Sequence, residues 1–160
     1  SIFKKVEENK TSLEQCDFIL CTGFFDEEEN DLIYYKSLLK DYTKKKLICT
    51  NPDLVVHRGD VEELCAGSIA KLFESMGGEV IYYGKPHKEI YEMCFKKGEK
   101  VLAIGDNLRT DIKGANNLNI DSLFIYSGVH RNEFKMDKDL PNLLSKYNVK
   151  IDYFQKELKW

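Results

Sequence analysis

The sequence has few of the features that mark secreted, membrane-bound or nucleic-acid-binding proteins. Its 160 residues include three prolines and one tryptophan, and no apolar run approaches the length that crosses a bilayer. The 24 basic and 27 acidic residues give a net charge of −3, so no basic excess indicates a nucleic acid partner. No signal-peptide pattern is found at its start. We therefore expect a cytoplasmic protein that binds neither membranes nor nucleic acid.

The five cysteines also lack the spacing of a disulfide framework or a zinc site. Their number is odd, and no two of them form a C-x-x-C pair. Three lie in or beside apolar runs. We interpret the cysteines as reduced core thiols. No local pattern supports a catalytic thiol, although the sequence leaves that alternative open.

The chain does have an alternation of short apolar runs and amphipathic segments. Strand-like runs lie at 17–22, 46–49, 54–56, 79–83, 101–104, 120–126 and 149–154. Helical spacing lies at 31–42, 60–76, 89–97, 108–118 and 139–147. The second helix is predicted to begin at Asp60, with Glu63 completing a capping box. This order predicts an α/β protein with mostly parallel sheets, in two units at 1–84 and 85–160.

The stretch VLAIGDNLRTD, residues 101–111, carries the strongest functional signal. Four apolar residues run into Gly105–Asp106, and Asp111 follows in the first turn of a helix. Such a run is typical of a parallel sheet covered on both faces, where ligands bind beyond the carboxyl ends of the strands. Two carboxylates beside backbone N–H groups suit Mg²⁺ together with a phosphate. The alternative is that Asp106 is a turn residue and Asp111 complements the helix dipole.

Two other segments fit the same chemistry. TNPD, which contains Asn51, Pro52 and Asp53, follows a predicted strand as a loop stiffened by its proline. GKPH, at 84–87, places Lys85 just before a helix. A lysine offers a compact positive charge for a phosphoryl oxygen, and the aspartates offer a metal site. Phosphoryl transfer requires both kinds of charge stabilisation.

These three motifs, in this order, resemble those of the haloacid dehalogenase (HAD)-like hydrolases. The resemblance is specifically to the class IIA phosphatases, which carry an inserted α/β cap. GKPH resembles the third motif, with Lys85 as its lysine, and GDNLRTD resembles the fourth, with Asp106 and Asp111 as its acidic pair. TNPD and the stretch CAGSIAKLFESMGGEVIYYGKP at 65–86 resemble the cap. The resemblance therefore implies an α/β cap in residues 1–84 and the C-terminal half of a Rossmannoid core in residues 85–160.

The resemblance also implies a Mg²⁺-dependent hydrolase of small phosphorylated metabolites. In the family, one aspartate attacks the phosphoryl group to form an aspartyl-phosphate, and a second aspartate acts as general acid and base. Lys85 would hold the charges of nucleophile and phosphate together. Asp106 would bind Mg²⁺ directly, with Asp111 close by or bound through water. The cap loop Asn51–Asp53 would face the cleft and contact the substrate.

The sequence departs from the family in one respect, the nucleophile. Asp17 precedes a strand instead of following one, and Asp26 lies in an acidic loop. Thr50 fits the cap better than the family's second motif. We therefore expect a fragment or processed product that does not hydrolyse phosphate esters alone. Its strand at 101–104 would present an unpaired edge that favours self-association or pairing with an N-terminal half.

Several alternatives remain open from the sequence. The chain could be an enzyme present in part, or a split-gene product that acts only by association with another chain. A receiver-like signalling domain is a third reading, but it would need paired acids at the end of the first strand, and CTGFF at 21–25 has none. His57 is interpreted as part of a surface turn. His130 and Arg131 are interpreted as part of a solvated loop, with an active-site role worth testing.

Overall fold

The computed structural model describes residues 4–28 and 30–159. The strands are β1 (Phe18–Cys21), β2 (Lys46–Cys49), β3 (Val55–Arg58), β4 (Val61–Leu64), β5 (Glu79–Tyr82), β6 (Leu102–Gly105), β7 (Asp121–Ile125) and β8 (Tyr153–Gln155). The α-helices are α1 (Leu32–Leu39), α2 (Ala66–Ser75), α3 (Lys88–Glu92), α4 (Lys113–Leu118) and α5 (Leu140–Tyr147). A π-helical turn, η4 (Leu108–Ile112), precedes α4, and short 3₁₀ turns are η1 (Lys4–Asn9), η2 (Asp26–Glu28), η3 (Lys40–Tyr42) and η5 (Asp137–Asp139). None of the helices in these two ranges is long and apolar enough to cross a membrane.

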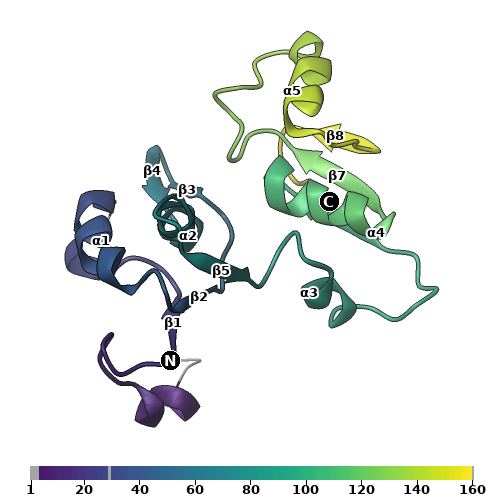
Figure 1. The fold of residues 1–160 in the computed structure, drawn as a ribbon. Helices are drawn as coiled ribbons and strands as arrows, with labels where there is room; N and C mark the ends of the chain where they lie inside the picture. Colours follow the sequence, from purple (N-terminus) through teal and green to yellow (C-terminus); the bar gives the residue numbers. More distant parts are fainter. Residues whose placement is uncertain (1–3, 29, 160) are drawn as a thin grey trace.

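Two three-stranded parallel sheets organise the chain. One has the order β1-β2-β5 and the other the order β6-β7-β8. Figure 1 shows the two sheets in separate groups of elements, joined by the segment between β5 and α3. The parallel pairing and the alternation of strands and helices confirm the predicted α/β class. The predicted division at residue 84 falls within the joining segment and stays a prediction.

The N-terminal core forms where one face of its sheet meets α2. Alternate residues of β2, Leu47 and Cys49, are fully buried on that face. Ile69 and Phe73 of α2 lie in the same cluster, as does Tyr35 of α1. Helix α1 begins cleanly because the Asp31 carboxylate accepts hydrogen bonds from two backbone N–H groups of its first turn.

The cysteines are free thiols in the described part of the chain, and they differ in burial. Cys21 and Cys49 lie in the N-terminal core, as predicted for core thiols. Burial raises the pKa of the Cys21 thiol to about 12, which suppresses its reactive thiolate form. Cys94 is exposed, so the prediction was wrong for that residue.

The C-terminal core lies between the β6-β7-β8 sheet and the helical segments that follow β6 and β7. Its buried residues are Leu108, Ile112, Phe124, Phe134, Leu143 and Val149. On β6, however, Leu102 and Ile104 are 46% and 41% exposed. The described residues therefore do not cover both faces of β6, contrary to the prediction from its apolar run. β6 also stands at the edge of its sheet, with β7 as its partner among the described strands.

The predicted start of the second helix at Asp60 was wrong, because α2 begins at Ala66. Val61–Leu64 is instead strand β4, which pairs antiparallel with β3 through a turn at Gly59 and Asp60. Gly59 has a φ of 62°, which a glycine adopts without strain. Cross-strand ion pairs also favour the hairpin: Arg58 Nε lies 2.9 Å from Glu63 Oε2. A Gly-Asp turn between two short β-type runs was the signal for this hairpin.

The helix predicted over 108–118 begins with a π-helical turn instead of an α-helical one. In η4 the N–H of Ile112 donates to the carbonyl of Asn107, five residues back. The Asn107 side chain caps this turn by accepting from the N–H of Arg109 at 3.0 Å. π-Helical turns are rare in proteins overall, but those that occur are often found at functional sites.

Candidate functional site

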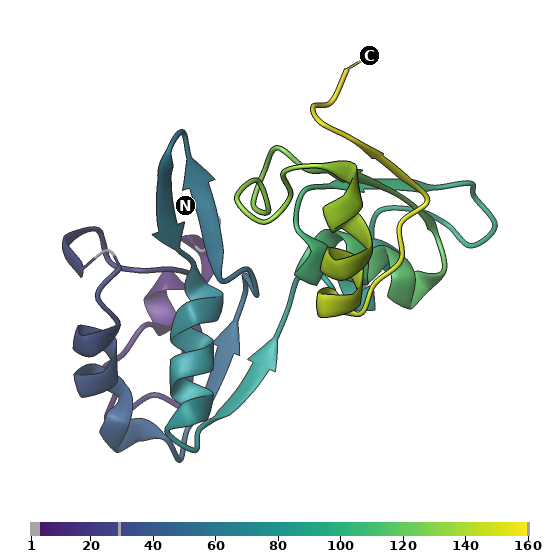
Figure 2. The same ribbon diagram turned by 90° about the horizontal axis from the view of Figure 1, so that it is seen from above.

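A cleft of about 380 Å³ lies where the β3–β4 hairpin faces the carboxyl end of β6. Figure 2 shows the hairpin beside the loop that follows β7. The cleft is lined by Asp53, Val55, Val56, His57, Gly59, Lys85, Asp106, Asn107, Asp111, Ser127, Gly128, Val129 and Arg131. It therefore joins the three sequence motifs, which are far apart in the chain.

Asp111 and Lys85 both line this cleft and form an ion pair. Lys85 Nζ donates to Asp111 Oδ1 at 2.6 Å. The other oxygen, Asp111 Oδ2, accepts from the backbone N–H groups of Asp106 and Asn107 at 3.2 and 3.1 Å. Both carboxylate oxygens of Asp111 are thus engaged by protein donors. Asp111 fixes the loop 105–107 and orients the lysine.

Asp106 follows the carboxyl end of β6, and its side chain is held by the loop after the neighbouring strand, β7. Its Oδ2 accepts from the backbone N–H of Val129, in the loop after β7, at 3.0 Å. A Cβ on Gly128 would overlap the Asp106 carboxylate, and a Cβ on Gly105 would overlap that of Asp111. Among the described residues, no donor contacts Asp106 Oδ1. That oxygen remains available to a ligand.

Asp53 connects the TNPD loop to η4. Its Oδ1 accepts from Asn107 Nδ2 at 2.8 Å and from Thr110 Oγ1 at 2.7 Å. Of the predicted substrate loop, Asp53 alone lines the cleft. Asn51 does not line the cleft, and its Oδ1 accepts from the N–H of Asp53 at 3.2 Å. No contact of Pro52 with the cleft is found in the described structure.

The charges in the cleft favour a protonated Lys85. Burial alone would lower the pKa of Lys85, but the hydrogen bond and charge of Asp111, with Asp53 and Asp106, raise it above its ordinary value. The ammonium group is therefore present at neutral pH. Three carboxylates line the cleft against two basic side chains, Lys85 and Arg131. This balance leaves an excess of negative charge that a cation would offset.

Comparison with known proteins agrees with this geometry. A family model for HAD-hydrolase-like proteins matches residues 82–150. Ribonucleotide monophosphatase NagD of Escherichia coli K12 is 31% identical over 88 residues, which are 52% of this chain and 34% of that protein. A solved hydrolase of the haloacid dehalogenase-like family from Brucella suis 1330 is 30% identical and superposes with a TM-score of 0.71 over 89% of this chain. Over these matched regions the chain is similar to the HAD-like hydrolases.

These similarities support the resemblance to the capped class IIA members that the motifs predicted. The p-nitrophenyl phosphatase of Archaeoglobus fulgidus shares the fold, with a TM-score of 0.63 and 18% identity over 92% of this chain. The chain spans 53% of the Brucella protein and 56% of the Archaeoglobus protein. It thus corresponds to about half the length of these HAD-like structures.

The structure also places three further residues that the sequence singled out, His57, His130 and Arg131. His57 lies on β3 with a side chain 8% exposed, and its Nδ1 is buried with no partner in the described structure. His130 is 2% exposed, so the prediction of a solvated loop was wrong for it. Arg131 Nη1 donates to the carbonyl of Gly59 at 2.9 Å, which ties the hairpin turn to the loop after β7. The sequence held no signal for these contacts beyond the position of His130 and Arg131 after a strand.

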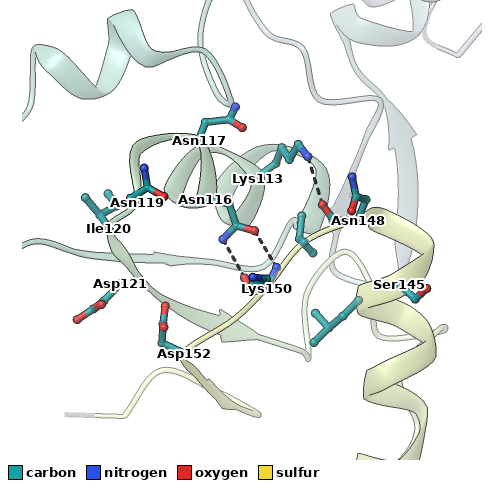
Figure 3. A pocket seen from close by; sticks show the side chains of 12 residues that line it. Lys113, Asn116, Asn117, Asn119, Ile120, Asp121, Ser145, Asn148, Lys150 and Asp152 are labelled. Carbon is teal, nitrogen blue, oxygen red and sulfur yellow. Dashed lines mark hydrogen bonds between the residues drawn. The ribbon is translucent and has the colours of Figure 1, made fainter.

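A larger cavity of about 660 Å³ lies at the other end of the C-terminal sheet of this HAD-like chain. Figure 3 shows its polar lining, where Asn116 exchanges two hydrogen bonds with the backbone of Lys150, at 2.9 and 2.7 Å. Lys113 Nζ donates to the carbonyl of Asn148 at 3.2 Å. These contacts join α4 to the segment before β8. Because ligands of parallel sheets bind at the carboxyl ends of strands, the cleft at Asp106 is the better functional site.

Proposed function

We propose that the chain forms the cap and the C-terminal core portion of a Mg²⁺-dependent phosphatase that acts on small phosphomonoesters. The observation that carries this proposal is the convergence of Lys85, Asp106 and Asp111 at the carboxyl end of β6. A fixed ammonium group and carboxylates suit a reaction whose barrier is lowered mainly by positioning and charge stabilisation. The relatives named as phosphatases support the same reaction class.

The donor set fits Mg²⁺. Mg²⁺ in proteins commonly keeps several waters and takes one or two carboxylates. Asp106 supplies an oxygen that no described donor contacts, whereas both oxygens of Asp111 already accept hydrogen bonds. We therefore propose Asp106 as the direct ligand, with Asp111 holding Lys85 and the loop in place. When bound, the ion would neutralise phosphoryl charge and complete the positive side of the cleft.

The remaining roles follow from the same geometry. Lys85, kept protonated by its acidic neighbours, would bind a phosphoryl oxygen. Asp53 would form the cap side of the substrate site, next to the hairpin residues that line the cleft. In the described part of the cleft, the carboxylates of Asp53 and Asp111 are engaged by internal donors. We propose that the nucleophilic aspartate comes from polypeptide outside these residues.

The test uses the product of the complete reading frame, assayed with p-nitrophenyl phosphate and Mg²⁺. Asp106→Asn and Lys85→Met should each lower kcat/KM by roughly 100-fold or more, because each removes charge from the transition-state environment. Lys113→Met, at the other cavity, is the matched control and should leave kcat/KM unchanged. Unchanged activity in Asp106→Asn would reject the proposed site. Turnover by residues 1–160 alone, lost in Asp106→Asn, would place the nucleophile within them.

A second candidate function is association without catalysis, and one observation favours it. Leu102 and Ile104 on β6 are exposed, as are Phe18 and Leu20 on β1. Exposed apolar residues on a sheet edge are a template for pairing with another chain. In this alternative the chain acts only by joining a separately made polypeptide. Phosphatase activity in the complete gene product would contradict it.

A further inference from the structure

His130 occupies an unusual position for a loop residue, because its imidazole is buried and both ring nitrogens are engaged. Nε2 lies 3.1 Å from the backbone nitrogen of Leu108, and Nδ1 lies 2.8 Å from Glu133 Oε1. A backbone N–H only donates, so Nε2 must be the acceptor. The ring proton therefore sits on Nδ1 and is donated to the Glu133 carboxylate.

On its Nδ1 side, His130 is fixed to α5 through Glu133. Glu133 accepts from the hydroxyl of Tyr147 at 2.8 Å and forms an ion pair with Lys146. The ring of Tyr147 packs edge-on against His130, with centroids 4.7 Å apart. The guanidinium of Arg109 lies 5.2 Å from the same tyrosine ring. The imidazole is thus held in one orientation by groups on several elements.

On its Nε2 side, His130 holds the loop that carries Asp106. Leu108 is two residues after Asp106 and opens η4. Val129, directly before His130, donates its backbone N–H to Asp106 Oδ2. Two consecutive residues after β7 therefore contact the Asp106–Leu108 segment at two points, one through backbone and one through a side chain.

We propose that His130 is a positioning residue that fixes the Asp106 carboxylate for cation binding. This inference rests on the proposed function, in which Asp106 binds Mg²⁺. Without the imidazole, the buried N–H of Leu108 would lose its acceptor, and the segment would move to find another. Outer partners of metal ligands act in this way, by restricting the orientation of the ligand.

The experiment compares His130→Ala, His130→Gln and Phe134→Leu in the product of the complete reading frame. Gln can offer both an acceptor and a donor, whereas Ala offers neither. Phe134 is buried in the same core, and its ring contacts Tyr126 and Phe154. Its truncation therefore serves as a destabilised control that leaves the His130 contacts in place. Mg²⁺ affinity is measured by titration, and amide hydrogen exchange is measured at Leu108 and Val129.

His130→Ala should weaken Mg²⁺ binding roughly 10-fold or more and speed exchange at both amides. His130→Gln should recover most of the affinity, and Phe134→Leu should retain it. Wild-type affinity in His130→Ala, or an equal loss in Phe134→Leu, would overturn the proposal. If the wild type binds no Mg²⁺, the metal assignment under the proposed function fails. The exchange data then decide whether His130 fixes the Asp106–Leu108 segment. Unchanged protection of the two amides in His130→Ala would reject that role.

Discussion

At the residue scale, two glycines allow the acidic groups of the cleft to approach the backbone. Gly105 lies against the Asp111 carboxylate, and Gly128 lies against that of Asp106. Neither position has room for a Cβ, although neither has a positive φ. The glycines are therefore required by close contact, and any side chain there would displace a carboxylate.

Gly128→Ala should consequently displace Asp106 and weaken Mg²⁺ binding. The expected loss of stability is about 1–3 kcal/mol, typical of overpacking. Gly23→Ala is the matched control, because a Cβ at Gly23 would meet no atom within 4 Å. Urea denaturation and Mg²⁺ titration of both variants test the prediction. Equal metal affinity in the two variants would contradict it.

The charge of Glu133 gives a second prediction at this scale. Burial opposes that charge, but hydrogen bonds from Lys146, His130 and Tyr147 lower the pKa of Glu133 from 4.5 to about 2. A lowered pKa means that the ionised form stabilises the fold above pH 4.5 and that this stability is lost as the pH falls towards 2. Glu133→Gln should be less stable than wild type at pH 7, and the difference should shrink on acidification. Urea midpoints of both proteins, measured from pH 7 to pH 2, check this; a constant difference would refute it.

At the scale of elements, the cleft depends on the hairpin and on η4. The β3–β4 hairpin forms one wall, and the π-helical turn places Asp111 beneath the loop at Asp106. The described contacts between the two walls are few and polar. Asp53 joins Asn107 and Thr110, and Arg131 joins the hairpin turn.

Arg131→Ala should therefore loosen the hairpin without unfolding the sheets. The reason is that Arg131 donates to the carbonyl of Gly59 at the hairpin turn. Hydrogen exchange at the amides of β4 should accelerate, while the exchange in β2 and β7 stays constant. Arg58→Ala, which removes an ion pair within the hairpin, is the comparison variant. If the amides of β4 lose less protection in Arg131→Ala than in Arg58→Ala, that result would speak against a role for the contact between the two walls.

At the scale of the whole molecule, each parallel sheet has helices packed on one face and exposed apolar side chains on at least one of its two edge strands. The exposed residues include Phe18 and Leu20 on β1, and Leu102 and Ile104 on β6; Tyr153 and Phe154 on the other edge strand of the C-terminal sheet, β8, are exposed as well. Figure 1 shows the two sheets in separate groups of elements. Such faces are expected to bind further polypeptide.

Residues 1–160 expressed by themselves should accordingly self-associate, and Leu102→Lys should reduce that association. A lysine on an edge strand disfavours pairing through its charge. Ile33→Lys is the control, because Ile33 is 80% exposed and lies on helix α1 instead of an edge strand. Sedimentation velocity over a range of concentrations gives the answer. A monomeric wild type would rule out association through this surface.

The sequence by itself determined the α/β class, most strands, and the motifs around Lys85, Asp106 and Asp111. These features depend on local periodicity and on short fixed spacings, which a single chain displays directly. The sequence did not reveal the burial of His130, the hydrogen bond from Thr110 to Asp53 or the ion pair of Lys85 with Asp111, because these contacts join residues remote in the chain. The tertiary structure decided them, since a hydrogen bond needs atoms within about 3 Å. The hairpin was misread for a different reason: its Gly-Asp turn and the capping pattern at Asp60 are competing local signals, and cross-strand pairing favoured the turn.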